Sequence, residues 1–407
     1  MRDNIIVGLD LGTSKIACIV GDINRGNPLK MKIIGVGTTE SHGLRKGVVV
    51  DIEETADSIR RAVEEAELTS GISIDSVYAG IAGGHIEGMT KSGVVAVSGK
   101  NNEITSTDLR RAIQIAQTCK ITVDREIIHV IPQGCIIDDQ ERVKDPIGMY
   151  GVRLEAFVHI VTGAVALAQN IIKSAYLAGV SVENIVLQPL ASGEAVLTFE
   201  EKGSGVLLMD IGGGTTDLIL YEDNVPMHTA VLPFGGQHVT NDIAAVLKMP
   251  YAEAEAVKIE KGCIMMEMDD MIARSHTGGK RNTKAASQYI LADIIQYRMT
   301  EIMGLVEQEI NNNRLTFPKK IVLTGGTSLL TGLGRLVQHI FRTPMRIGYP
   351  GIENGLTDKI NSPIYATGVG LVLYGGKQRR NGVDTSIKGN LFEEIYKRMQ
   401  NWFKEYF

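Results

Sequence analysis

The 407-residue sequence lacks several patterns that would assign it at once to a familiar class. It has no G-x-x-x-x-G-K-[ST] motif, which excludes a Walker-type P-loop ATPase. It has no run of about 20 apolar residues, so no transmembrane helix is expected. Asp3 and Asp10 interrupt the first apolar stretch, so no signal peptide is expected either.

Metal-binding side chains and excess charge are also scarce. The four cysteines have no C-x-x-C spacing and the eight histidines have no H-x-x-H or H-x-x-x-H spacing, which argues against a zinc site. The formal net charge of −5 argues against nonspecific binding to nucleic acid, so no nucleic-acid partner is expected. The length predicts two to four subdomains with an ample core.

Two similar glycine-rich segments are what the sequence does contain. Residues 6–17 read IVGLDLGTSKIA and residues 207–220 read LLMDIGGGTTDLIL. In each, an apolar run brings an aspartate to a tight turn and a second apolar run leaves it. The glycines let backbone N–H groups approach an anion, and the aspartate can hold a metal ion against a phosphate. One copy alone also fits an ordinary hairpin, but two copies predict two related halves that close on one nucleotide.

A third glycine turn follows a buried-type strand at 321–330, IVLTGGTSLL, and we expect it to face adenine or ribose. Three such turns in this order resemble the actin, Hsp70 and sugar-kinase superfamily. The resemblance implies an α/β, two-lobed actin-like ATPase fold made of duplicated ribonuclease-H-like domains.

The end of the sequence carries a second strong pattern. Residues 375–390 are polar and glycine-rich, which predicts a flexible linker. Residues 391–407, placed on a helix, separate completely into an apolar and a charged face, which predicts an amphipathic helix in a membrane interface; a helix docked on the protein's own core is the alternative. The residues expected to contact lipid are Leu391, Phe392, Ile395, Met399, Trp402, Phe403 and Tyr406.

An actin-type fold with such a tail resembles the FtsA family of bacterial cell-division actin homologues. The resemblance covers nearly the whole chain and includes the segments HVIPQ at 129–133, DPIGMYGVRL at 145–154 and HIVT at 159–162. It implies an ATP- and Mg²⁺-binding protein, with at most weak ATPase activity, that polymerises on the cytoplasmic face of the inner membrane at the septum. It also implies tethering of FtsZ filaments through the FtsZ C-terminal peptide and recruitment of later divisome membrane proteins.

The same resemblance divides the chain into parts. Three segments form the first lobe (1A), and one inserted α+β subdomain (1C) lies between the first two of them. The second lobe has a core (2A) and a helical subdomain (2B). The ranges are 1–83, 163–193 and 359–374 for 1A, 84–162 for 1C, 194–235 and 313–358 for 2A, 236–312 for 2B, 375–390 for the linker and 391–407 for the membrane helix.

Site residues also follow from the resemblance, position by position. Asp10 and Asp210 match the carboxylates that hold Mg²⁺, possibly through water, and Gln188 stands where relatives place a residue that orients the attacking water. Glu255 and Lys258 match an E-x-x-K helix that reaches the nucleoside, although their spacing also fits a surface pair. The phosphate turns are Gly12, Thr13, Ser14 and Lys15, and Gly212, Gly213, Gly214 and Thr215; the adenosine turn is Gly325, Gly326 and Thr327.

The sequence also suggests a partner-binding surface, and three alternative functions have to be weighed against the FtsA-like one. Arg298 and Glu301 match the R-x-x-E of the surface for the FtsZ C-terminal peptide, and an exposed ion pair is their plainer interpretation. A soluble small-molecule kinase of the same superfamily is the alternative function, but it gives the amphipathic tail no role. An Hsp70-like chaperone needs more chain after Tyr374 than is present, and the 129–133 and 145–154 segments speak against a pilus or cell-shape homologue.

Overall fold

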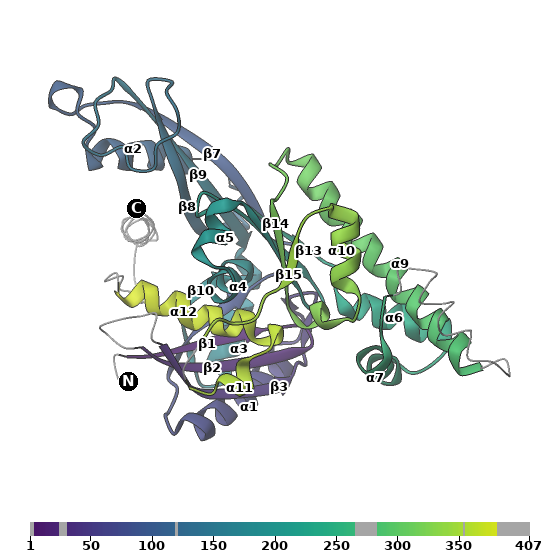
Figure 1. The fold of residues 1–407 in the computed structure, drawn as a ribbon. Helices are drawn as coiled ribbons and strands as arrows, with labels where there is room; N and C mark the ends of the chain where they lie inside the picture. The colour runs from purple at the N-terminus through teal and green to yellow at the C-terminus, as the bar shows by residue number, and fades with distance from the viewer. Residues whose placement is uncertain (1–3, 24–30, 119–120, 265–282, 353–354, 381–407) are drawn as a thin grey trace.

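The computed structural model describes residues 4–23, 31–118, 121–264, 283–352 and 355–380 (Figure 1). Two lobes are each built on a five-stranded sheet. The first sheet contains β1 (Ile5–Leu11), β2 (Lys15–Ile23), β3 (Met31–Glu40), β6 (Ser76–Ile81) and β10 (Ser181–Leu187). The second contains β11 (Val206–Ile211), β12 (Thr216–Glu222), β13 (Val225–Leu232), β14 (Lys320–Thr324) and β15 (Met345–Ile347).

The two sheets have the same topology. Their strand orders are β10-β6-β1-β2-β3 and β13-β12-β11-β14-β15. In each sheet the first three strands in chain order form an antiparallel meander. The fourth strand pairs in parallel with the first, and the fifth pairs in parallel with the fourth. The repeat confirms the prediction of two related halves. It also places the two glycine-rich hairpins, β1–β2 and β11–β12, at equivalent positions in the two lobes.

Helices cover the first sheet because their apolar faces match it. Helix α1 (Ile52–Ser70) begins after its N-cap, Asp51, whose carboxylate accepts hydrogen bonds from the N–H groups of Glu53 and Glu54 at 3.0 Å. Its apolar face is buried at Ala56, Ile59, Ala62, Val63 and Ala66, which removes that face from water. The other helices of this lobe are α3 (Val165–Leu177), α4 (Gln188–Val196) and α12 (Ala366–Arg380).

Strand β10 ends at Leu187, because Gln188 and Pro189 begin α4 and proline is favoured in the first turn of a helix. One predicted boundary was wrong. We expected a linker from residue 375, but α12 continues to Arg380. Its last turn is held by an ion pair from Lys377 to Glu194 at 2.5 Å and by another from Arg379 to Glu183 at 2.8 Å. The rest of the predicted linker and the predicted membrane helix lie outside the described residues.

The second lobe has its own apolar core, between its sheet and the helices that cover it. Short elements complete both lobes: the hairpin of β4 (Leu44–Arg45) and β5 (Val48–Val49), and the 3₁₀ turns η2 (Gly326–Leu329) and η3 (Pro363–Tyr365). The helices of the second lobe and its edges are α5 (Phe199–Ser204), α6 (Gly236–Leu247), α7 (Tyr251–Lys261), α9 (Thr283–Asn312), α10 (Leu333–Phe341) and α11 (Thr357–Ile360).

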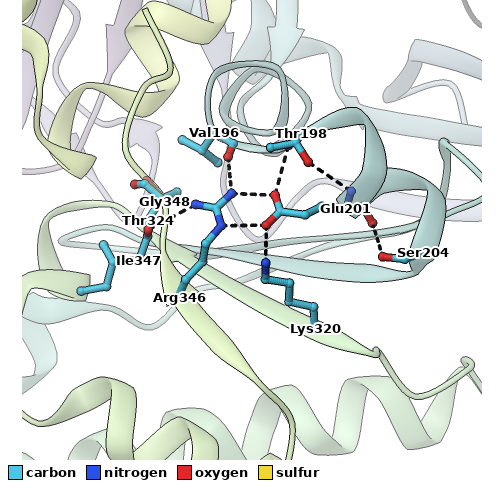
Figure 2. A network of polar contacts seen from close by, with 9 residues as sticks. All are labelled: Val196, Thr198, Glu201, Ser204, Lys320, Thr324, Arg346, Ile347 and Gly348. Atoms are coloured by element: carbon cyan, nitrogen blue, oxygen red, sulfur yellow. Dashed lines mark hydrogen bonds and ion pairs between the residues drawn. The ribbon is translucent and has the colours of Figure 1, made fainter.

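An ion network around the buried Glu201 fastens α5 to two strands of the second sheet (Figure 2). The Glu201 carboxylate accepts two hydrogen bonds from Arg346, at 2.7 and 2.6 Å, and one contact from Lys320 at 2.7 Å. It also accepts the backbone N–H of Thr198 at 3.1 Å, so Glu201 caps its own helix. Lys320 lies on β14 and Arg346 on β15, so the network joins α5 to both strands.

An inserted module of about 80 residues lies between the first and second passes of the chain through the first lobe. Figure 1 shows it projecting beyond the two lobes. It has a separate apolar core, and it contacts the second lobe through Gln133, which donates to the carbonyl of Pro226 at 2.9 Å, and through His159, which bonds the Thr229 hydroxyl at 2.8 Å. Its elements are β7 (Glu87–Ala96), η1 (Lys100–Asn102), α2 (Ser106–Gln117), β8 (Arg125–Ile137) and β9 (Arg153–Ala164), with sheet order β7-β9-β8.

Candidate functional site

A cavity of about 530 Å³ lies where the two lobes meet. Both glycine-rich hairpin turns, helix α7 and the 3₁₀ turns η2 and η3 contribute to its walls. The structure brings together here the residues that the sequence proposed for phosphate, metal, nucleoside and water. These are Asp10, Gly12, Thr13, Ser14, Lys15, Gln188, Asp210, Gly212, Gly213, Gly214, Thr215, Glu255, Lys258, Gly325, Gly326 and Thr327.

The two hairpin turns have the same local geometry. The N–H of Gly12 donates to the carbonyl of Lys15 at 3.0 Å, and the N–H of Gly212 donates to the carbonyl of Thr215 at 2.9 Å. The turns meet face to face across the cavity. A Cβ atom added to Gly213 would collide with the Ser14 hydroxyl, and one added to Gly214 would collide with the Thr13 hydroxyl. The glycines are therefore required for the close approach of the lobes.

Two buried carboxylates stand beside these turns. The Asp210 carboxylate accepts hydrogen bonds from the hydroxyls of Ser192, at 2.5 Å, and Thr367, at 3.1 Å. Asp10 lies 3.7 Å from the ammonium group of Lys15. Burial raises the pKa of Asp10 to about 6; the charge of Lys15 opposes that rise, and the nearby carboxylate of Asp210 adds to it. Burial also raises the pKa of Asp210.

Asp217 is a third cavity carboxylate, which the sequence reasoning did not select as a site residue. It lies opposite Asp210 in the β11–β12 ladder, where the first hairpin has Ala17 opposite Asp10. One carboxylate oxygen of Asp217 accepts the Thr215 hydroxyl at 3.0 Å, and the other is buried with no hydrogen-bond partner among the described residues. Burial and the nearby Asp210 raise the pKa of Asp217 well above its usual range. The sequence feature that could have identified Asp217 is its position at the end of the second glycine-rich motif, DIGGGTTD.

A divalent cation fits this end of the cavity. Burial raises the pKa of Asp10, Asp210 and Asp217 there, and a bound cation would favour their ionised forms. Among the described residues, no three acidic, histidine or cysteine side chains converge into a complete protein metal site. A cation held here would therefore take its remaining ligands from phosphate oxygens and water, as Mg²⁺ commonly does.

Lys15 links the first turn to the start of α12. Its ammonium group donates to the carbonyl of Ile364 at 2.6 Å and lies 4.7 Å from the centre of the Tyr365 ring. The same ammonium group is 3.7 Å from the carboxylate of Asp10. Lys15 therefore places one positive charge between Asp10 and η3, the turn that precedes α12.

The other end of the cavity is formed by α7 and the third glycine turn. Lys258 is buried and contacts Glu255 at 2.7 Å, the Thr240 hydroxyl at 2.9 Å and the Gly236 carbonyl at 3.2 Å. The pair therefore lies inside the cavity and is not a surface pair. The hydroxyl of Thr327 donates to the Gly212 carbonyl at 2.9 Å, so the third turn packs directly on the second.

Gln188 lies at the first position of α4, facing the same cavity. It is 8% exposed, and its amide nitrogen donates to the carbonyl of Leu11 at 3.3 Å, immediately before the first glycine turn. This hydrogen bond fixes the amide relative to the first hairpin. The side chain is thus held at the cavity wall by the backbone of one lobe.

Arg298 and Glu301 lie outside the cavity, on α9. Arg298 contacts Glu301 at 2.6 Å, as their spacing predicts, but its stronger partner is Asp242 on α6, which accepts two hydrogen bonds at 2.6 and 2.9 Å. Asp242 was not selected from the sequence because it lies 56 residues away. The guanidinium is therefore fixed from both sides, while Glu301 stays largely exposed.

The residues proposed for lipid contact, 391–407, lie outside the described part of the chain. Of the helices that the structure describes, none is both long and apolar enough to cross a bilayer.

Comparison with known proteins identifies close relatives of the whole chain. The sequence model described as Cell division protein FtsA matches residues 207–370, and the one described as SHS2 domain inserted in FTSA matches residues 83–162. Cell division protein FtsA of Pseudomonas aeruginosa is 40% identical over 98% of this chain and 97% of the relative. Its counterpart in Escherichia coli K12 is 35% identical over 99% of this chain and 98% of the relative.

Solved structures of lower identity share the fold. A PilM–PilN type IV pilus biogenesis complex matches with a TM-score of 0.65 and 16% identity over 91% of this chain and 98% of that chain. MreB5 of Spiroplasma citri, solved bound to ADP, matches with a TM-score of 0.52 and 14% identity over 94% of this chain and 98% of that chain. At this level of identity the likeness concerns the fold alone, and it agrees with the two-lobed actin-like architecture.

Proposed function

This chain belongs to the FtsA family of cell division proteins, and we propose from that premise that it is an ATP-dependent polymer that tethers FtsZ filaments to the cytoplasmic face of the cell membrane at the septum. The observation that carries the proposal is the cavity between the lobes. It is walled by two equivalent glycine turns, each with a buried aspartate beside it.

ATP would lie with its phosphates between the two turns and its nucleoside against the third glycine turn and α7. Backbone N–H groups of the turns and the ammonium group of Lys15 suit phosphate oxygens. Glu255 and Lys258 sit where a ribose or base would enter. The proposal is supported by the shared fold of MreB5, which has been solved with ADP and with AMPPNP.

Mg²⁺ would be held by Asp10 and Asp210, directly or through water. The ion supplies positive charge that neutralises the phosphates as they approach the buried carboxylates. Ser192 and Thr367 fix the orientation of the Asp210 carboxylate through their hydrogen bonds. The chain itself thus contributes binding, orientation and exclusion of water at this position.

Hydrolysis of ATP is expected to be slow. Gln188 is placed to orient a water molecule, but an amide does not abstract a proton strongly. Its hydrogen bond to the Leu11 carbonyl supports a positioning role at the first phosphate turn. The protein would then act mainly through the binding of ATP and the closure of the lobes around it, and less through repeated hydrolysis.

Membership of the FtsA family also leads to the proposed binding surfaces for partners. Arg298 and Glu301 would bind the FtsZ C-terminal peptide on the helical face of the second lobe. The module that matches the inserted SHS2 domain would contact neighbouring subunits and later divisome membrane proteins. The amphipathic segment 391–407 would lie in the membrane interface, joined to α12 by residues 381–390.

The alternative of a soluble small-molecule kinase uses the same cavity, and it is less favoured because the relatives matched over the full length are cell division proteins. It would also leave the amphipathic tail without a role.

Asp210→Asn tests the assignment of the cavity. The amide is a poorer ligand for Mg²⁺, so the affinity for Mg-ATP should fall at least about tenfold, measured by isothermal titration calorimetry. Asp223→Asn is the matched control, because Asp223 is exposed in the turn between β12 and β13. Intact Mg-ATP affinity in Asp210→Asn would remove the cavity assignment.

A further inference from the structure

The β4–β5 hairpin of the first lobe has an unusual residue at its tip. Its two-residue turn consists of Lys46, with φ of 50°, and Gly47, with φ of 77°. Positive φ at both positions is typical of the tightest hairpins and favours asparagine or glycine at the first position. A lysine there is therefore not selected by the turn itself.

This tip lies directly on the two phosphate turns. The N–H of Gly47 donates to the Thr13 hydroxyl at 3.0 Å, which leaves the hydroxyl hydrogen of Thr13 free to point at another acceptor. The Cα atom of Lys46 is 2.9 Å from the position that a Cβ on Gly214 would occupy. The tip therefore contacts the first turn in its own lobe and the second turn across the cleft.

The side chain of Lys46 also crosses to the second lobe. Its ammonium group lies 5.7 Å from the centre of the Phe234 ring, just before α6. The first N–H groups of α6, from Gly236 and Gln237, donate to the carbonyls of Gly212 and Gly213. Among the described residues, no carboxylate forms an ion pair with Lys46. The exposed positive charge of Lys46 thus stands at the junction of the lobes, and its Cα atom lies against the second turn.

The position along the turn indicates which phosphate would be reached. The residues expected near the nucleoside contact the beginning of the second turn. Thr327 donates to the Gly212 carbonyl, and Lys258 donates to the carbonyl of Gly236, whose own N–H donates to Gly212. Lys46 lies against Gly214, two residues further along. A chain of phosphates that starts at the nucleoside end reaches Gly214 last.

We propose that Lys46 binds the terminal phosphate of a nucleoside triphosphate and closes the two lobes over it, so that the β4–β5 hairpin distinguishes triphosphate from diphosphate. The inference rests on the proposed nucleotide function of the cavity. In the diphosphate complex Lys46 has no phosphate to bind and stays over Phe234. Gly47 acts as a positioning residue, because its N–H turns the Thr13 hydroxyl toward the same phosphate.

Lys46→Gly tests this without endangering the fold, because glycine suits a positive φ better than lysine does. Lys248→Gly is the matched control: Lys248 is an exposed lysine with φ of 52° at the end of α6. Isothermal titration of the full chain with Mg²⁺ and adenylyl imidodiphosphate or ADP would give both affinities. Loss of one charge-assisted hydrogen bond predicts about a tenfold weaker affinity for the triphosphate analogue, with ADP affinity changed less than about twofold.

Lys46→Arg should restore most of the preference for the triphosphate, since it retains the charge. Equal loss of affinity for both nucleotides in Lys46→Gly, or no loss for either, would overturn the inference while leaving the cavity assignment in place. A wild-type chain that binds neither nucleotide would instead overturn the proposed function itself.

Discussion

Glu201 shows how single residues hold the second lobe together. Its carboxylate is 7% exposed, and it takes hydrogen bonds from Arg346 and Lys320, which lie on two neighbouring strands (Figure 2). Burial alone would raise the pKa of Glu201, but the hydrogen bonds from Arg346 and Lys320 outweigh it and lower the pKa to about 2. The ionised carboxylate is therefore the form that the folded protein stabilises.

Glu201→Gln should lower the free energy of unfolding by about 1.5–3 kcal/mol at pH 7, because it leaves two half-buried cations without their counter-charge. A depressed pKa in the folded state contributes stability above the unfolded pKa, near 4.3, that is lost as the pH falls toward 2. The difference between wild type and variant should therefore shrink from pH 5 toward pH 2. Urea unfolding at several pH values measures it.

Glu307→Gln is the control for that experiment, because Glu307 is an exposed glutamate on α9 of the same lobe. Its midpoint should match that of the wild type. A Glu201→Gln variant as stable as the wild type at pH 7 would show that the network contributes only packing.

Part of the site could be predicted at this scale, and part could not. Asp10, Asp210 and the glycines stand in short contiguous motifs, so local spacing was enough to find them. Ser192 and Thr367 reach Asp210 from positions 18 and 157 residues away, and only the folded chain brings them there. No local pattern in the sequence distinguishes these hydroxyls from others.

At the scale of elements, regular patterns predicted the hairpins and helices but not all of their ends. Asp51 and the buried face of α1 agree with the local rules for helix caps and amphipathic helices. The end of α12 does not, because Gly375 and Gly376 normally indicate a break in a helix. Here they are required instead: Gly375 packs against Ile6 and Gly376 against Ile23, where a side chain has no room. The sequence gives no sign of such a long-range packing constraint.

Helices α6 and α9 form the surface that we propose for the FtsZ C-terminal peptide. Arg298 is oriented by Asp242, so the exposed carboxylate of Glu301 stands beside a fixed guanidinium. Glu301→Ala should weaken binding of a labelled FtsZ C-terminal peptide roughly tenfold, the value of one charged hydrogen bond, measured by fluorescence anisotropy. Glu307→Ala, an exposed glutamate on the same helix, should bind like the wild type.

Equal affinity in Glu301→Ala and the wild type would move the peptide site away from this face of α9. Arg298→Ala is a less informative variant, because it also leaves Asp242 without its bidentate partner and would disturb the packing of α6 on α9.

At the scale of the whole molecule, duplication explains the architecture. Two sheets of one topology place two aspartates and two glycine turns on opposite walls of one cavity. The repeated motif in the sequence was sufficient to predict this arrangement. The contact of the inserted module with β13, through Gln133 and His159, was not predictable, because it joins segments that share no pattern.

The end of α12 also decides how the tail is studied. A chain cut at Lys377 would lose the Arg379–Glu183 ion pair and the last turn of the helix. A chain that ends at Arg380 keeps both and removes only the residues proposed to link and bind the membrane. It is therefore the appropriate tail-less variant.

The most direct test of the account is vesicle flotation with a labelled FtsZ C-terminal peptide, Mg-ATP and one of four chains. The full chain should carry the peptide to the top of the gradient, and a chain ending at Arg380 should bind the peptide but stay at the bottom. Trp402→Glu should also stay at the bottom, because it places a charge on the apolar face of the proposed helix, whereas Gln400→Glu, on the polar face, should float. Flotation of the chain ending at Arg380, or a full chain that leaves the peptide behind, would contradict the proposal that this protein tethers FtsZ to the membrane.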